Sequence, residues 1–170
     1  MEIERKFWIK NNPVFEYSKD SIIIQSYINM PDDFYEIRLR KYETILGTGA
    51  YWNGIPEYKY YIDFKGPGEI EREEFGTKLT KEQYDKLIPH AKKSLIKKRY
   101  YLDKPGVFFD VYNGDLKGLK TLEVEGDREY VDDFTLGKDW DSVDVTYISK
   151  FKNRNIVYKK WDDIKDWVVI

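Results

Sequence analysis

The chain has 170 residues and a mass of 20.5 kDa, with 29 basic and 31 acidic side chains, a formal net charge of −2 and no cysteine. This near-neutral balance argues against a general nucleic-acid or anionic-membrane binder, and the lack of cysteine excludes disulfides, thiolate zinc sites and cysteine nucleophiles. With one histidine, no apolar run of membrane length and no signal-peptide core, we expect a cytoplasmic chain whose chemistry uses carboxylates, lysine, arginine and tyrosine.

Strand signals recur along the chain, and no linker rich in proline, glycine or serine divides it, so residues 1–170 are expected to form one domain. Alternating apolar and polar positions, with many β-branched and aromatic residues, predict eight strands. The predicted ranges are Glu2–Ile9, Ser21–Asn29, Tyr35–Tyr42, Tyr58–Lys65, Glu69–Gly76, Ser94–Asp103, Val107–Tyr112 and Leu119–Glu125.

Helix signals are fewer. Thr80 followed by Gln83 resembles an N-cap with its capping-box partner, and it predicts a helix that ends near Pro89. Apolar residues at helical spacing predict a terminal helix over Asp162–Val169. The stretch Glu43–Glu57 holds several glycines and a proline, which indicates a long loop.

Charged residues recur at a spacing of two on several predicted strands, so they share one face of each strand. Acids of this kind are Glu2, Glu4, Glu74, Asp110, Glu123 and Glu125, and bases are Lys6, Arg38, Arg40, Lys65, Arg72, Lys97 and Arg99. The opposite faces carry apolar residues such as Ile3, Leu39 and Val124.

Two interpretations fit this pattern. In the simpler one, each strand has a wet face whose charges form surface ladders, and for a single strand this is the better choice. As a set, however, the charges are mostly grouped by type and balanced in sign. About eight antiparallel strands can close into a barrel wide enough for a ligand. Charged faces pointing inward would then place an acidic and a basic cluster in the lumen.

Such a lumen has a clear chemical use. Clustered Arg and Lys side chains repel one another in a low-dielectric site unless a polyanion such as a triphosphate neutralises them. Clustered carboxylates repel likewise, and a hard cation such as Mg²⁺ or Mn²⁺ relieves that repulsion and bridges to phosphate. The two clusters together therefore suggest a metal–polyphosphate site.

The same residues resemble the motifs of the CYTH, or triphosphate tunnel metalloenzyme, superfamily, in order along most of the chain. Glu2-Ile-Glu4-Arg-Lys6 resembles its ExExK signature, Arg38-Leu-Arg40 its RxR strand, Lys65 with Arg72-Glu-Glu74 its lysine and RxE pair, Lys97-Lys-Arg99-Tyr100 its KxRY strand, and Glu123-Val-Glu125 its ExE strand. Near the C-terminus, Lys150-Phe-Lys-Asn153 resembles a basic-aromatic-x-Asn pattern of prokaryotic relatives.

The resemblance implies a mainly β, α+β fold: a closed eight-stranded antiparallel barrel forming a tunnel, with a few peripheral helices. It implies a metal-dependent triphosphatase that takes Mg²⁺ or Mn²⁺ and a small triphosphate, as a monomer or homodimer. Glu2, Glu4, Glu123 and Glu125 would hold the metal, while Glu74 and Asp110 would support it or hold a second ion. Arg38, Arg40, Lys65, Arg72, Lys97 and Arg99 would bind phosphate oxygens. Lys6 would contact phosphate or position the attacking water, with Glu2 and Glu4 completing the catalytic set.

Inorganic tripolyphosphate is the expected substrate, because the short chain leaves little room for an elaborate specificity pocket. The alternatives on the same scaffold are a class IV adenylate cyclase or a nucleoside or thiamine triphosphatase, for which Trp52 in the glycine-rich loop could stack on a ring. A non-catalytic polyphosphate binder is the alternative from another class, although a pure anion binder would not need the acidic set. No nucleic-acid or membrane partner is expected.

Overall fold

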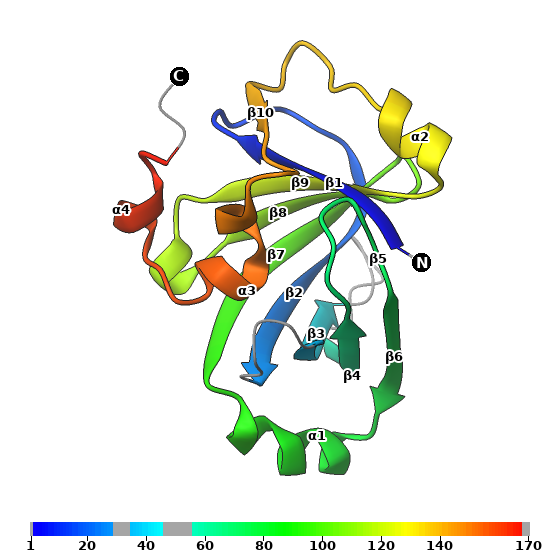
Figure 1. Ribbon diagram of the computed structural model, residues 1–170, viewed down its shortest axis with the longest axis vertical. Helices are drawn as coiled ribbons and strands as arrows, with labels where there is room; N and C mark the ends of the chain where they lie inside the picture. The colour runs from blue at the N-terminus through cyan, green and yellow to red at the C-terminus, as the bar shows by residue number, and fades with distance from the viewer. Residues whose placement is uncertain (1, 29–34, 46–55, 168–170) are drawn as a thin grey trace.

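A computed structural model describes residues 2–28, 35–45 and 56–167 of the chain. Its strands form one antiparallel sheet that curls round a shared interior (Figure 1). The strands are β1 (Glu2–Ile9), β2 (Tyr17–Ile28), β3 (Glu36–Ile45), β4 (Pro56–Lys65), β5 (Glu71–Arg72), β6 (Glu74–Leu79), β7 (Lys93–Leu102), β8 (Val107–Tyr112), β9 (Lys120–Glu125) and β10 (Ser142–Asp144). The predicted strands Glu2–Ile9 and Val107–Tyr112 are confirmed with their ends, Glu69–Gly76 is divided into β5 and β6, and the other five are present with shifted ends.

The helices are short. They are α1 (Lys81–Leu87), α2 (Arg128–Asp133), α3 (Asn153–Ile156) and α4 (Trp161–Ile164), with 3₁₀ turns η2 (Ile88–His90), η3 (Gly114–Leu116) and η4 (Ser149–Phe151). The predicted capping box of α1 is confirmed, because the Thr80 hydroxyl accepts a hydrogen bond from the Gln83 amide and the Gln83 side chain accepts one from the Thr80 amide. The terminal helix ends at Ile164, earlier than predicted, and residues 168–170 lie outside the described part.

The sheet order is β10-β1-β9-β8-β7-β2-β3-β4-β6, and β5 pairs back onto β1. The predicted strand Glu69–Gly76 is interrupted at Glu73, because its first part pairs with β1 (Glu2↔Arg72, Ile3↔Glu71) and its second part pairs with β4. This change of partner joins the two edges. Counting β5 and β6 as one interrupted strand gives the predicted eight-stranded barrel, to which β10 is added beside β1.

The apolar faces of the strands point away from the barrel interior. Phe7, Phe109 and Leu122 belong to a buried cluster on the outer side of β1, β8 and β9, which Val131 of α2 covers. Sequence reasoning missed α2; Asp127 caps it by accepting a hydrogen bond from the Tyr130 amide. The charged faces are consequently left to line the inside.

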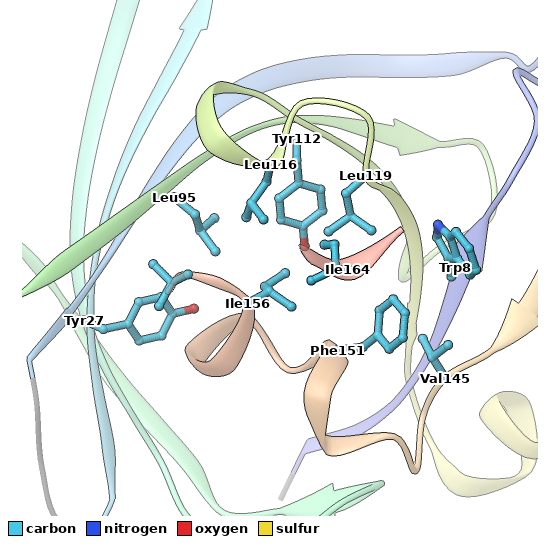
Figure 2. Close-up of a cluster of buried hydrophobic side chains, with 11 residues drawn as sticks. Trp8, Tyr27, Leu95, Tyr112, Leu116, Leu119, Val145, Phe151, Ile156 and Ile164 are labelled. Atoms are coloured by element: carbon cyan, nitrogen blue, oxygen red, sulfur yellow. The ribbon is translucent and has the colours of Figure 1, made fainter. Parts of the chain in front are cut away.

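A second apolar cluster covers one end of the barrel. Figure 2 shows Phe151, Ile156 and Ile164 of the C-terminal segment packed with Leu95 and other residues of the barrel end. The segment therefore closes the end at which β1 and β8 finish and β7 begins. This placement could not be read from the sequence, where α3 and η4 give no strong helical signal.

Candidate active site

The barrel encloses a cavity of about 410 Å³ that is lined mostly by charged side chains. Eleven of the residues expected at the site line it: Glu4, Lys6, Arg38, Arg40, Lys65, Arg72, Glu74, Lys97, Arg99, Glu123 and Glu125. The period of two thus correctly identified the inward faces. The surface-ladder interpretation is wrong for this set, because these side chains are buried or half-buried.

Two expected residues need separate treatment. Asp110 is fully buried and lies behind the wall, held by Lys97 and Arg99, and it is not among the described residues that line the cavity. Glu2 pairs with Arg72 through the backbone of β1 and β5, and its side chain lies outside the described part of the structure. Trp52 and most of the predicted loop also lie outside it, while Glu43–Ile45 and Pro56–Glu57 extend the neighbouring strands.

The two ends of the cavity differ in character. At the covered end, Asn153 accepts hydrogen bonds from Lys6 Nζ at 3.0 Å and from the Tyr112 hydroxyl at 2.7 Å. At the other end the lining includes three aromatic residues, Tyr42, Tyr101 and Phe108, of which the last two are cross-strand partners with ring centroids 5.4 Å apart. A linear ligand would therefore lie between a polar floor and an aromatic rim.

Acids and bases alternate along the wall, so the expectation of one acidic and one basic cluster is wrong. Lys6 Nζ lies 3.1 Å from Glu123 Oε1, and Arg72 donates to Glu4 Oε2 at 3.0 Å. Register explains the mixing, because Lys6 on β1 stands directly opposite Glu123 on β9. The sequence gives the spacing along each strand but not the pairing between strands.

The same alternation continues on the far side of the cavity. Glu74 contacts two bases, since its Oε2 lies 2.9 Å from Lys65 Nζ and its Oε1 lies 3.3 Å from an Arg38 nitrogen. Each base is thereby held beside a carboxylate at modest exposure. Ordered cations of this kind are suited to accepting a polyanion, because little side-chain freedom remains to be lost on binding.

Burial and neighbouring charge set the protonation of the wall. Burial alone would raise the pKa of Glu123, but Lys97, Lys6 and Arg99 more than offset it and hold that pKa well below its usual range. Burial and then the adjacent Arg99 lower the pKa of Lys97 to about 8, although Asp110 and Glu123 oppose the shift. At neutral pH the wall therefore carries the ionised Glu123 beside Lys97, which gives up its proton more readily than an ordinary lysine does.

Among the described side chains, Glu4 and Glu125 form a pair that could hold a hard cation. They are cross-strand partners on β1 and β9 and line the same cavity, and such partners have Cβ atoms about 4.5–5.5 Å apart. Carboxylate oxygens are the ligands that Mg²⁺ prefers, so the donor chemistry fits. Within the described residues, no three acidic or histidine side chains already converge as a metal cluster. A cation would have to draw Glu4 from Arg72.

Sequence reasoning missed several members of the site. Glu36 lines the cavity two residues before Arg38, and Asp63 lies two residues before Lys65, buried beside Arg38 and Arg40. Extending the spacing of two by one step from the bases already chosen would have found both. The aromatic rim could not be predicted in the same way from the sequence, because tyrosine and phenylalanine also occur on apolar faces.

No helix in the described ranges has both the length and the apolar character needed to cross a bilayer.

Comparison with known proteins gives a consistent result for sequence and fold. The chain is 28% identical over 157 residues to the inorganic triphosphatase of Nitrosomonas europaea. The aligned residues cover 90% of this chain and 94% of that protein. It matches a crystal structure of the inorganic triphosphatase NE1496 at 26% identity and a TM-score of 0.59, over 92% of this chain and 94% of that one.

A second crystal structure, of the hypothetical protein NE1496, matches at 25% identity and a TM-score of 0.60, over 94% of this chain and 99% of that one. No family model matches the chain. The similarity nevertheless extends over nearly the whole length and includes the barrel that places the charged cavity.

Proposed function

This chain belongs to the triphosphate tunnel metalloenzyme superfamily, and from that premise we propose that it hydrolyses inorganic tripolyphosphate to diphosphate and phosphate with a divalent metal ion. The observation that carries the proposal is the enclosed cavity, in which cations from five strands face one space. Its volume of about 410 Å³ is near the lower end of the range of small-molecule sites, about 300–1,000 Å³. A compact polyanion suits it better than a large ligand.

The bases would bind the phosphate oxygens. These are Lys6, Arg38, Arg40, Lys65, Arg72, Lys97 and Arg99. Phosphoryl transfer needs mainly positioning and stabilisation of charge, so the site needs no histidine or cysteine. The guanidinium groups would contact oxygens of the transferred phosphoryl group and offset the charge that develops there.

The metal site would be built on the acids of β1 and β9, namely Glu2, Glu4, Glu123 and Glu125, with Glu74 and Asp110 in support. Bound Mg²⁺ or Mn²⁺ would polarise the phosphoryl oxygens and neutralise part of the substrate charge. In the structure Glu4 is paired with Arg72. A metal–triphosphate complex could exchange these partners, so that the carboxylate turns to the cation and the base turns to phosphate.

Lys6 is the proposed group that contacts phosphate or positions the attacking water, and Glu2 and Glu4 complete the catalytic set. Its ammonium lies between Glu123 and Asn153 at the covered end of the cavity and is almost wholly buried. Because both contacts fix the Nζ atom, Lys6 can hold the terminal phosphate or the attacking water in line for displacement.

An organic triphosphate is the second candidate, and one observation favours it. Tyr42, Tyr101 and Phe108 form an aromatic rim that could contact a base or another ring while the phosphates lie deeper. A cyclase or a nucleoside or thiamine triphosphatase would use such a rim, and tripolyphosphate would not.

The test is phosphate release from tripolyphosphate by metal-stripped protein, with and without Mg²⁺ or Mn²⁺, beside ATP with a cyclic AMP readout. We expect metal-dependent release from tripolyphosphate, slow ATP turnover and no cyclic AMP. Arg99→Gln should lose most activity, while Lys98→Gln, a neighbour half in solvent and paired with Asp20, should keep it. The absence of metal-dependent release from tripolyphosphate would refute the proposal, and cyclic AMP formation would favour the cyclase.

A further inference from the structure

Asp63 lies on β4 at the register position directly opposite Arg38 on β3. Its side chain is almost completely buried, and it is not among the described residues that line the cavity, whereas Arg38 and Arg40 are. An unpaired buried carboxylate would be costly, so its partners define what it does.

Those partners are the two arginines of β3. Arg40 donates from Nε to Asp63 Oδ2 and from an Nη atom to Oδ1, both at 2.6 Å, and a longer contact of 3.4 Å joins Arg38 Nε to Oδ2. The other Nη atom of Arg40 donates to the Tyr42 hydroxyl at 2.7 Å.

These contacts fix the plane of the Arg40 guanidinium. In the described part of the chain they occupy three of the five N–H donors that a guanidinium carries. The remaining two belong to a side chain that lines the cavity and is only partly buried. Among the described residues, Asp63 therefore holds the edge formed by Nε and one Nη atom, and the two N–H groups not used in these contacts can turn to phosphate oxygens.

The neighbouring strand leaves room for this carboxylate. Gly76 on β6 is the cross-strand partner of Asp63. A Cβ atom at Gly76 would lie 2.7 Å from Asp63 Oδ1 and 2.6 Å from the Ile62 carbonyl oxygen. The absence of a side chain at this inward position thus permits the orientation in which Asp63 reaches Arg40.

The same arrangement occurs on the other side of β2. Asp110 on β8 stands opposite Arg99 on β7, and it accepts from Arg99 Nε at 2.8 Å and from an Nη atom at 2.7 Å. Lys97, two residues before Arg99, also contacts it. Each strand bordering β2 thus carries two cavity bases, and a buried aspartate on the next strand out anchors both.

We propose that Asp63 is a positioning residue for triphosphate binding: it holds Arg40, and less tightly Arg38, in the orientation that faces the phosphates, without touching the substrate itself. The inference rests on the proposed function for the identity of the ligand. It assigns a role to a carboxylate outside the family motifs quoted above.

The direction in which one substitution changes the affinity for tripolyphosphate separates this role from a simple charge effect. Asp63→Asn removes a negative charge near a polyanion site, and Coulomb's law alone would make tripolyphosphate bind more tightly. Loss of positioning would instead weaken binding. The side-chain amide nitrogen introduced by Asp63→Asn would face arginine donors, so Arg40 would become free to rotate. We expect tripolyphosphate to bind about tenfold more weakly.

The experiment measures the Kd for tripolyphosphate by calorimetry in EDTA for wild type, Asp63→Asn, Arg40→Gln and the double variant. If Asp63 acts through Arg40, its substitution should cost less than about threefold in the Arg40→Gln background. Asp20→Asn removes the same charge from an ion pair on the outer face and should leave Kd unchanged. In turnover with Mg²⁺, Asp63→Asn should raise KM while kcat changes less than about threefold.

Equal or tighter binding by Asp63→Asn would overturn the inference, as would an undiminished loss in the Arg40→Gln background or no binding by wild type. A fold defect would appear as a lowered Tm with the same loss in both backgrounds, which also counts against it. Wild-type protein that binds tripolyphosphate but releases no phosphate with Mg²⁺ or Mn²⁺ would refute the proposed function, while the Kd values still decide the role of Asp63.

Discussion

Lys97→Met tests the electrostatics of the cavity wall through the pH dependence of stability. Lys97 is almost wholly buried, and burial followed by the charge of Arg99 lowers its pKa to about 8 from 10.5. Between these two values the unfolded chain binds more protons than the folded protein, so the contribution of this group to stability rises with pH. Methionine keeps the length of the side chain and removes the titration.

The size of the effect follows from the two pKa values. The slope above the folded-state pKa is about 1.4 kcal/mol per pH unit. The free energy of unfolding of wild type, relative to that of Lys97→Met, should therefore rise by about 2 kcal/mol between pH 7 and pH 9.5. Below about pH 7 the difference between the two proteins should be constant, because Lys97 is then protonated in both the folded and the unfolded state. Above about pH 10 tyrosine ionisation intervenes, so the comparison stops short of it.

The assay is denaturant unfolding followed by tryptophan fluorescence, in EDTA, at several values from pH 7 to pH 9.5. Lys98→Met is the matched control, since Lys98 is the next residue on β7, is half in solvent and has a raised pKa. It stays protonated throughout this range, so its difference from wild type should not change with pH. A pH-independent difference for Lys97→Met would refute the reasoning.

Three further experiments have expected outcomes. Glu4→Ala and Glu125→Ala should each lower phosphate release at limiting Mg²⁺ and regain part of it at high Mg²⁺; full activity of both at limiting Mg²⁺ would contradict the metal assignment. Gly76→Ala should cost about 1–3 kcal/mol in thermal unfolding, because its Cβ would lie 2.6 Å from a backbone oxygen. Gly137→Ala is the control and should be nearly neutral, because a Cβ atom at Gly137 would lie 3.9 Å from Trp140 Cδ1. Phe151→Ala should cost about 3–5 kcal/mol by the same measurement, since Phe151 is fully buried, and a smaller loss would mean that the C-terminal segment is not firmly packed.

The inward faces of the barrel were predictable because a strand alternates with a period of two. Arg38 and Arg40, for example, had to share a face whatever the strand paired with. The register between strands was not predictable, and it is register that sets Lys6 opposite Glu123 and mixes the acids with the bases. The depth of each side chain was also not predictable, because spacing alone does not show that Asp110 lies behind the cavity wall and not on its surface.

Other misses have local physical causes. The break at Glu73 arises because one short strand must pair with β4 on one side and reach β1 on the other, a demand that only the closed sheet creates. β10 has three residues and no strand signature of its own, and it forms because β1 offers a free edge beyond β5. Helix α2 depends on Asp127 as its cap and on Val131 against the outer core.

The covering of one barrel end by the C-terminal segment has a consequence for the order of events in turnover. With this end of the barrel covered by Phe151 and its neighbours, a ligand that comes from the side of the aromatic rim would approach the covered end along the cavity. A linear polyphosphate must then enter tip first, and only groups near its tip can reach Lys6. Longer chains would be trimmed from their ends, never cut in the middle. After cleavage, the fragment at the covered end of the cavity would leave last, because the other product lies between it and the aromatic rim.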